Sequence, residues 1–286
     1  MTCPLCAEES FAPSWLGSTR YREKEIPYVA CKRCGSLYCR PMPDAFDLAA
    51  MYGTSYGSGA AAEGLPDPKE PEWVLGWLKR LPPGSFLDYG CGRGELLVEA
   101  AKLGWKPLGV ELTEEVAEKT ASATALPVMP VEDAVRRGLL ADVLHLGDVL
   151  EHLTDPDREM PRILSLLGRG GLLLAQGPLE ANGNLFTWTI RLVRSLKRRA
   201  PISSPPYHVI LATVEGQWTF FRRFGLEAIE EQVSEVSWPA PERLSLRDAV
   251  RPERGVLFAL RLASRSFSRL RPGRWGNRYR YAGRHG

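Results

Sequence analysis

A strand-like segment, 85–89, runs directly into three glycines placed two residues apart, Gly90, Gly92 and Gly94. Glycine has no Cβ atom, so the backbone at these positions can bend sharply and approach a bound molecule closely. The following residues, 95–103, carry apolar side chains at the spacing of one helix face. A strand, a glycine turn and a helix in this order predict the first unit of a sheet flanked by helices.

Strand-like segments recur along the chain and alternate with helical ones, such as the helix expected at 213–224. After the first, we expect strands at 107–112, just before Pro130, and at 142–146, 171–178, 226–234 and 255–264. The 286 residues, 44% hydrophobic and 25% charged, suit one full core and a small extra module. We therefore predict an α/β domain over 73–264, with a seven-stranded, mostly parallel sheet flanked by helices.

Acidic residues stand where the predicted strands end. Asp88 lies at the end of the first strand, Glu111 ends the second, and Asp148 follows the fourth. The carboxyl ends of parallel strands meet at one edge of a sheet, where ligands bind. Asp88 would repel a pyrophosphate and suits a cationic ligand that bears an ammonium group. Glu111 is placed to accept hydrogen bonds from both hydroxyls of a ribose.

Residues 86–94 resemble the first motif of class I S-adenosylmethionine (SAM)-dependent methyltransferases. The resemblance implies a Rossmann-like domain. In this family the glycine turn holds the amino acid part of SAM, the acid at the second strand binds ribose, and an acid after the third strand contacts adenine. The implied cofactor-binding residues are Asp88, Tyr89, Gly90, Cys91, Gly92, Gly94, Glu111, Leu112, Glu132, Asp133 and Asp148.

Four of the six cysteines form two C-x2-C pairs separated by 24 residues, Cys3 with Cys6 and Cys31 with Cys34. Two such turns can close a tetrahedral thiolate site, which is the arrangement of a zinc ribbon. The energy of zinc binding folds a segment that is too small for a core of its own. We predict a structural zinc ion in a ribbon module over 1–45, and Cys39 as a buried small apolar residue.

A segment rich in Pro, Gly and Ala, 46–72, follows the ribbon as a linker, or as a lid that orders over a ligand. Its Tyr52 and Tyr56, with the second C-x2-C pair, Gly35, Pro41 and Pro43, resemble one subgroup of these methyltransferases. That subgroup is associated with glycan, nucleotide-sugar and natural-product pathways. The resemblance implies an acceptor of that kind.

Methyl transfer from a sulfonium is a direct displacement, and a base is needed when the nucleophile is a hydroxyl or a carbon acid. His208 and His152 are the candidate catalytic residues, because histidine titrates near neutral pH and both lie in predicted cleft segments. His208 also stands in a segment that resembles the Pro-x-His segment of the same subgroup. The alternative for His152 is a structural role at a helix start, and His145 is expected to be structural.

Positive charge is concentrated at the end of the chain. Residues 251–286 contain ten Arg against one acid, Glu253, and so carry +9 in a chain of net charge +3. We expect a basic tail over 265–286, in which Trp275, Tyr279 and Tyr281 would suit stacking on RNA bases. A basic amphipathic helix is expected at 184–199, either on an anionic membrane surface, or as a lid, or packed on the sheet.

The sequence favours a methyltransferase for a glycan, nucleotide sugar, lipid-linked sugar or natural product. An RNA methyltransferase is the main alternative, and a non-catalytic zinc-ribbon binding protein is the second. A nicotinamide oxidoreductase is disfavoured because the turn lacks the G-x-G-x-x-G spacing. The chain starts without a secretory pattern and has no apolar stretch near the ~20 residues of a membrane span. We expect a cytoplasmic protein, peripheral at the inner membrane surface if the basic helix binds lipid.

Overall fold

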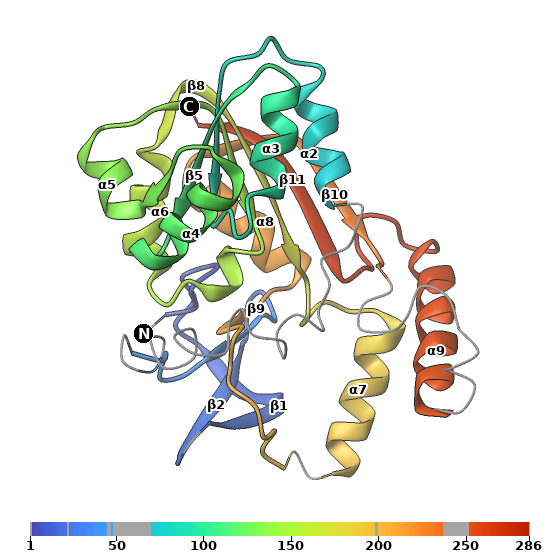
Figure 1. The fold of residues 1–286 in the computed structure, drawn as a ribbon. Helices are drawn as coiled ribbons and strands as arrows, with labels where there is room; N and C mark the ends of the chain where they lie inside the picture. The colour runs from blue at the N-terminus through green and yellow to red at the C-terminus, as the bar shows by residue number, and fades with distance from the viewer. Residues whose placement is uncertain are drawn as a thin grey trace.

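The computed structural model describes residues 2–21, 23–44, 47, 70–197, 200–236 and 252–285. Figure 1 shows a large sheet with helices around it, a small sheet built from the N-terminal segment, and a pair of helices, α7 and α9, beside them. Tyr52 and Tyr56, and nearly all of the predicted linker, lie outside the described residues.

The large sheet has seven strands in the order β10-β11-β8-β7-β4-β5-β6. Their bounds are β4 Ser85–Tyr89, β5 Lys106–Glu111, β6 Val128–Pro130, β7 Ala141–Gly147, β8 Leu167–Pro178, β10 Leu226–Ser234 and β11 Arg278–His285. The strands from β8 to β6 are mutually parallel, whereas β11 runs antiparallel to both β8 and β10. The predicted Rossmann-like, mostly parallel sheet is confirmed.

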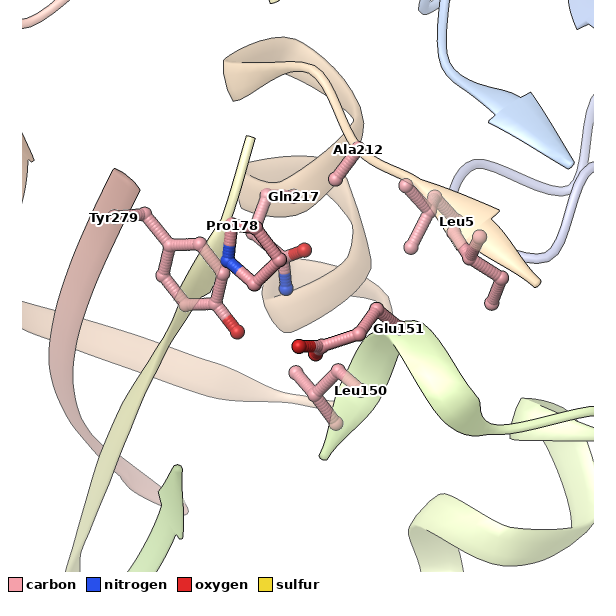
Figure 2. Close-up of a pocket in the computed structure, with 8 residues that line it drawn as sticks. Leu5, Leu150, Glu151, Pro178, Ala212, Gln217 and Tyr279 are labelled. Atoms are coloured by element: carbon pink, nitrogen blue, oxygen red, sulfur yellow. The ribbon is translucent and has the colours of Figure 1, made fainter. Parts of the chain in front are cut away.

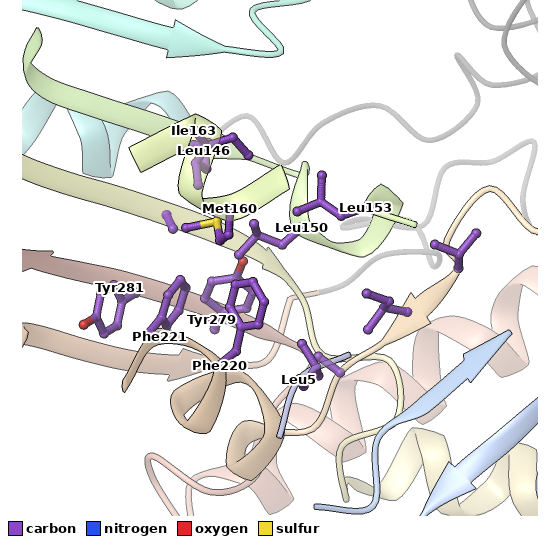
Figure 3. Packing of buried hydrophobic residues seen from close by; sticks show 14 of the residues in the cluster. Leu5, Leu146, Leu150, Leu153, Met160, Ile163, Phe220, Phe221, Tyr279 and Tyr281 are labelled. Carbon is purple, nitrogen blue, oxygen red and sulfur yellow. The ribbon is translucent and has the colours of Figure 1, made fainter. Parts of the chain in front are cut away.

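Side chains alternate between the two faces of each strand, and each face is covered by helices. The helices of this domain are α2 Glu70–Leu78, α3 Glu95–Lys102, α4 Glu114–Thr124, α5 Val131–Arg136, α6 Pro156–Leu164 and α8 Val214–Arg223. On β4, Phe86 packs in the cluster that contains Leu97 of α3, while Leu87 packs in the cluster that contains Met160 of α6 and Phe221 of α8. Figure 3 shows this second cluster, in which α6 and α8 meet β11.

The strand predicted at 255–264 is wrong. These residues belong to helix α9, Pro252–Ser268, in which Arg261 and Ser264 stand one turn apart and both donate to the Glu235 carboxylate at 2.8 Å. The antiparallel seventh strand is instead β11, inside the segment predicted as a tail. A short apolar run does not by itself distinguish a helix from a strand.

The aromatic residues of β11 also lie differently from the prediction. Tyr279 and Tyr281 are each 1% exposed, and the Tyr281 ring stacks on Phe221 at 3.9 Å between centroids (Figure 3). They therefore cannot stack on RNA bases. Alternation places them on the buried face, and the intervening arginines gave the segment its tail-like composition.

The N-terminal segment forms a second, antiparallel sheet with the order β1-β2-β3-β9. Its strands are β1 Phe11–Tyr21, β2 Lys24–Cys31, β3 Leu37–Cys39 and β9 Ile210–Leu211. The last strand comes from the part of the chain that otherwise builds the large sheet, and α8 packs closely on the first segment. A Cβ atom at Gly216 of α8 would lie 2.2 Å from Ser36 Oγ and 3.2 Å from Cys34 Sγ. The expected 1–45 module is thus completed by a strand from far along the chain.

The helix expected at 184–199 is α7, Leu185–Leu196, which begins where the Asn184 side chain accepts a hydrogen bond from Thr187 N at 2.7 Å. It contacts α9 side by side (Figure 1). The Trp188 ring meets Phe267 of α9 edge-on at 6.3 Å. Among the described residues, no helix is both long enough and apolar enough to cross a membrane.

Candidate functional site

The glycine turn follows β4 in a conformation that favours glycine. Gly90, Gly92 and Gly94 have φ angles of 74°, 54° and 75°, in the region that L-residues rarely adopt. Gly90 N–H donates to Val110 O of β5 at 2.8 Å. A Cβ atom at Gly94 would lie 2.7 Å from Thr124 Cγ2 of α4. The turn is therefore fixed between β5 and α4.

One side of this turn is open. The ideal Cβ position of Gly92 has no heavy atom within 4 Å, whereas a Cβ at Gly109 beneath it would lie 2.7 Å from Cys91 Sγ. Leu112, just after β5, is 67% exposed despite its apolar side chain. The backbone at Gly92 and the Leu112 side chain are thus accessible to a ligand.

Glu111, the last residue of β5, lies directly against the turn. Its carboxylate accepts hydrogen bonds from Gly92 N at 2.5 Å and from Leu112 N at 3.3 Å. Burial raises the pKa of Glu111, although the Gly92 hydrogen bond opposes this. An acid at the end of the second strand and the glycine turn after the first strand therefore share one place, as the sequence predicted.

The other predicted cofactor residues differ in their surroundings. Asp88 is buried, and its carboxylate accepts a hydrogen bond from the His145 ring, with 2.7 Å between Nδ1 and Oδ1. Glu132 and Asp133 lie in the first turn of α5, after β6, where they pair with Arg162 and Arg136 at 3.3 and 2.9 Å. Tyr89 is half-buried at the end of β4, and Cys91 is buried beneath the turn. Among these acids, Asp88 points inward while Glu132 and Asp133 stay at the sheet edge.

Asp148 follows β7 with a φ of 52°. Its two carboxylate oxygens accept from the Nη1 and Nη2 atoms of Arg278, each at 2.9 Å. Partial burial opposes ionisation of Asp148, but the Arg278 charge outweighs it and lowers the pKa of this carboxyl. Arg278 comes from β11, so the strand that the sequence did not reveal supplies a cation to the residue that follows β7.

A second cluster lies beyond Asp148, where a 3-10 turn, Leu150–His152, meets the segment before β9. His208 Nδ1 lies 2.7 Å from Glu180 Oε2, and His152 Nδ1 lies 2.7 Å from the Tyr207 carbonyl oxygen. The two imidazole rings meet edge-on with centroids 4.9 Å apart. Val209 N–H donates to Glu151 O at 2.9 Å and so holds the two segments together. The two predicted catalytic histidines therefore lie side by side.

Charge and burial set the protonation of this cluster. Burial alone would lower the pKa of His208, but the hydrogen-bonded Glu180 carboxylate, with Glu151 and Asp148, raises it to about 9. Burial, with the nearby His208, lowers the pKa of His152 to about 4. Burial and the Asp148 carboxylate raise the pKa of Glu151 to about 8. At neutral pH, His208 is thus charged and His152 neutral.

The sequence did not single out Glu151, Glu180 or Arg278. Glu151 is 5% exposed, and its carboxylate points into a small cavity between Leu5, Gln217 and Tyr279 (Figure 2). Its position directly before His152 was a signal, as was the position of Glu180 just after β8. The Gly90 turn is linked to this cluster, because a Cβ at Gly90 would lie 3.1 Å from Val149 Cγ2.

The four N-terminal cysteines meet in one buried cluster, with their sulfur atoms within 4.8 Å of one another. Cys3 Sγ lies 3.8 Å from Cys34 Sγ, and Cys6 Sγ lies 3.4 Å from Cys31 Sγ. A tetrahedral ion with Zn–S bonds of about 2.3 Å requires sulfur separations of about 3.8 Å. The cluster therefore has the dimensions of a tetrahedral thiolate site. Cys39 is fully buried outside it.

A parallel sheet with a glycine turn after one central strand and an acid ending the next is the arrangement of a Rossmann-like, cofactor-binding domain. A family model described as a methyltransferase domain matches residues 71–231, which is more than half of the chain. The chain belongs to this family of methyltransferase domains.

Curated relatives include the ribosomal protein L11 methyltransferases of Vibrio campbellii, 30% identical over 158 residues, and of Aliivibrio salmonicida, 28% identical over 162 residues. The first alignment covers 51% of this chain and 50% of the relative, and the second covers 53% and 51%. The chain thus spans about half the length of the curated relatives it matches.

Solved structures of similar fold include the magnesium protoporphyrin IX methyltransferase of Synechocystis PCC 6803 with bound S-adenosylhomocysteine (SAH). Its TM-score is 0.54 at 14% identity, over 85% of this chain and 100% of that one. A SAM-dependent methyltransferase from Thermotoga maritima gives a TM-score of 0.51 at 17% identity, over 83% of this chain and 98% of that one. At these identities the likeness concerns the fold.

Proposed function

We propose that this methyltransferase acts on a small-molecule acceptor, namely a glycan, nucleotide sugar, lipid-linked sugar or natural product. The observation that carries the proposal is the cluster of His152, His208, Glu151 and Glu180 next to the strand-end turn. It brings two imidazoles and two carboxylates together, with Glu151 buried and the His208 and Glu180 side chains about a third exposed. Such a cluster of polar groups suits a compact polar acceptor.

SAM would bind over the open side of the glycine turn. Gly92 fits this role because a side chain there would fill the space that the cofactor needs. Glu111 would accept from the two ribose hydroxyls, and exposed Leu112 would cover the adenine ring. The residues assigned to the cofactor are Asp88, Tyr89, Gly90, Cys91, Gly92, Gly94, Glu111, Leu112, Glu132, Asp133 and Asp148. Asp88 and Asp148 would act partly through their partners His145 and Arg278.

When bound, SAM supplies an electrophilic methyl group on a positively charged sulfur. The chain then has to align the acceptor, exclude water and activate the nucleophilic atom. His152 and His208 are the residues proposed for activation, because their rings adjoin in the cluster beyond Asp148. Neutral His152 would accept the proton of the nucleophile, and charged His208 would donate a hydrogen bond to the acceptor. Glu180 would position His208 through the hydrogen bond to Nδ1.

The charges of the site favour a small polar acceptor over RNA. Asp148, Glu151 and Glu180 gather near the histidines, and carboxylates repel the continuous phosphate backbone of RNA, whereas a sugar could enter the cluster with any phosphate held outside it. Arg261 and Arg278, two of the ten C-terminal arginines, are buried in ion pairs with Glu235 and Asp148. The basic surface available to nucleic acid is therefore smaller than the composition indicates. A ribosomal protein acceptor, as in the curated relatives, is the alternative that an acceptor screen must include.

Replacing His208 with Asn is expected to reduce SAH production by about 100-fold or more, since a positioned acid or base contributes about 10²–10⁴-fold. SAM binding should stay within twofold, because His208 lies outside the glycine turn. The measurement is a coupled SAH assay on a panel of nucleotide sugars, lipid-linked glycans, RNA and ribosomal proteins. His285→Asn, at an exposed position in β11, is the matched control. Full activity of His208→Asn, or turnover on RNA alone, would contradict the proposal.

We also assign a structural zinc ion to Cys3, Cys6, Cys31 and Cys34. The support is the four buried sulfur atoms and their near-tetrahedral separations. Cys34 N–H lies 3.5 Å from Cys31 Sγ, as expected for an amide that supports a thiolate within a C-x2-C turn. Four protein ligands leave no open position, so this ion would stabilise the fold without taking part in catalysis.

A second proposal concerns a membrane surface, and α7 and α9 carry it. Trp188, Leu192 and Leu196 of α7 recur every fourth residue and are 39%, 62% and 76% exposed, which makes an apolar stripe open to solvent. Exposed arginines, Arg269 and Arg271, stand at the nearby end of α9. The α7 cations are not part of this surface, because Arg191 and Arg194 donate to backbone carbonyls of the chain.

The chain is therefore expected to float with vesicles that contain phosphatidylserine and to stay in solution with neutral vesicles. Leu192→Glu together with Leu196→Glu should reduce the bound fraction at least tenfold, because each buried Leu contributes about 1.5–3 kcal/mol. Leu140→Glu, an equally exposed Leu before β7, is the control. Equal flotation of the double variant and the control would remove the membrane proposal and leave the methyltransferase assignment intact.

A further inference from the structure

Three potential metal ligands converge in the cluster beyond Asp148. One carboxylate oxygen of Glu151 and one ring nitrogen from each of His152 and His208 all lie within 4.8 Å of one another. Among the described residues, only the four cysteines form another such group. Imidazole nitrogen and carboxylate oxygen are the ligands that first-row divalent cations take in sites with open positions.

The hydrogen bonds of the two histidines have the pattern of metal ligands. A carboxylate and a carbonyl oxygen can only accept, so Nδ1–H of His208 donates to Glu180, and Nδ1–H of His152 donates to the Tyr207 carbonyl. Metal-binding histidines characteristically donate their second ring N–H to a carboxylate or a backbone carbonyl. In both rings, Nε2 is then the nitrogen left for a cation, which in His208 would displace the proton that the metal-free ring carries.

Glu151 supplies an independent observation. The residue is only 5% exposed, and its Oε1 atom has no hydrogen-bond partner among the described residues. A buried carboxyl oxygen that lacks a hydrogen-bond donor is costly. The cavity that it faces has no Lys, Arg or His among its lining residues, which include Gln217 and Tyr279 (Figure 2), and the nearby positive groups are His208 and Arg278. A bound cation would offset this cost.

We propose that Glu151, His152 and His208 bind a divalent first-row cation and leave coordination positions open. The role of this cation in the reaction rests on the proposed function. An acceptor hydroxyl bound to the cation would have a lowered pKa, so its oxygen would be ready for methylation. The two histidines would then activate the acceptor through the cation, with Glu180 positioning His208.

The test is a titration of the zinc-replete, full-length protein with Mn²⁺. Electron paramagnetic resonance measures the concentration of the free ion at each step of the titration. Mn²⁺ prefers oxygen and nitrogen ligands, so it discriminates against the four thiolates. We expect one Mn²⁺ per chain and nitrogen couplings from histidine in the pulsed spectrum. Glu151→Gln and His208→Ala should abolish this binding, and Glu180→Gln should weaken it by about 10–100-fold. His285→Ala should leave it unchanged.

Circular dichroism melting of each variant separates loss of a ligand from loss of the fold. Absence of Mn²⁺ binding by the folded wild-type chain would overturn the metal site, as would binding without nitrogen couplings. The proposed function is judged separately, from SAM binding and SAH production with and without a chelator that leaves the zinc in place. Turnover that is unaffected by removing the second cation would also overturn the metal proposal, while the acceptor assignment would stand.

Discussion

Replacing Glu111 with alanine is expected to weaken SAM binding by at least about 100-fold. The carboxylate lies at the junction of β5 and the glycine turn, where it accepts from Gly92 N at 2.5 Å. In the complex it would accept from two ribose hydroxyls, and a hydrogen bond to a charged group contributes about 1.5–3 kcal/mol. Two such bonds correspond to roughly 3 kcal/mol or more, and each 1.4 kcal/mol is a factor of about ten in affinity. Calorimetric titration with SAM and SAH measures the change.

Glu114→Ala is the matched control for this substitution. Glu114 is an exposed acid in the first turn of α4, three residues further along the chain, and has the same charge. The affinity of this variant should stay close to that of the wild type, so a general charge effect can be separated from a ribose contact. Undiminished SAM binding by a folded Glu111→Ala protein would refute the assignment of this carboxylate.

The parallel core was predictable because its signals are local. Each of β4, β7 and β8 places apolar residues in the buried clusters on both faces of the sheet, and such segments are visible in the sequence. The glycine turn was equally visible, since the three positive φ angles at Gly90, Gly92 and Gly94 demand that residue type. These local features are sufficient to place the edge of the sheet at which the proposed cofactor site lies.

The C-terminal part was not predictable in the same way. In β11, Tyr279 and Tyr281 are separated by Arg280 and preceded by Arg278, so the strand resembles a charged tail. Arg278 is only 8% exposed because Asp148, 130 residues earlier, neutralises it. A partner at that distance in sequence cannot be inferred from composition. For the same reason, the ion pair between Arg261 and Glu235 was not visible in the sequence, and α9 was not predicted as a helix.

The candidate site, too, was predictable only in part. His152 and His208 were found from the sequence, but their arrangement depends on residues whose roles appear only in space. Glu180 is 28 residues from His208, and Tyr28 OH donates to the His208 carbonyl across 180 residues at 2.7 Å. The second contact joins two parts of the molecule, because Tyr28 belongs to β2 of the N-terminal sheet. The cysteine module therefore touches the segment that carries a proposed catalytic residue.

Because of that contact, a substitution in the cysteine cluster is expected to have the second large effect on activity. Cys34→Ser is expected to remove the bound zinc and to unfold the small sheet, because structural zinc contributes about 10–16 kcal/mol to the folding of modules of this kind. The segment also packs Leu5, Leu37 and Tyr38 into the main core, but three strands of this size have little core of their own without the ion. Strand β9 and His208 would lose their support, since β9 pairs with β3 and Thr213 Oγ1 donates to Cys34 O at 2.7 Å. Activity should fall together with zinc content.

Hydrogen exchange with zinc analysis by mass spectrometry tests this expectation directly. In Cys34→Ser, amides of β1, β2, β3 and β9 should lose protection, whereas those of β4 and β5 should keep it and SAM should still bind. Cys39→Ala is the matched control, because Cys39 is fully buried in the same sheet but outside the four-sulfur cluster. It should retain one zinc per chain. A wild-type protein without zinc, or a Cys34→Ser protein with unchanged exchange in β9, would show that the cluster does not support the site. Selective loss at β9 with retained cofactor binding would instead establish that the N-terminal module positions the acceptor side of the enzyme.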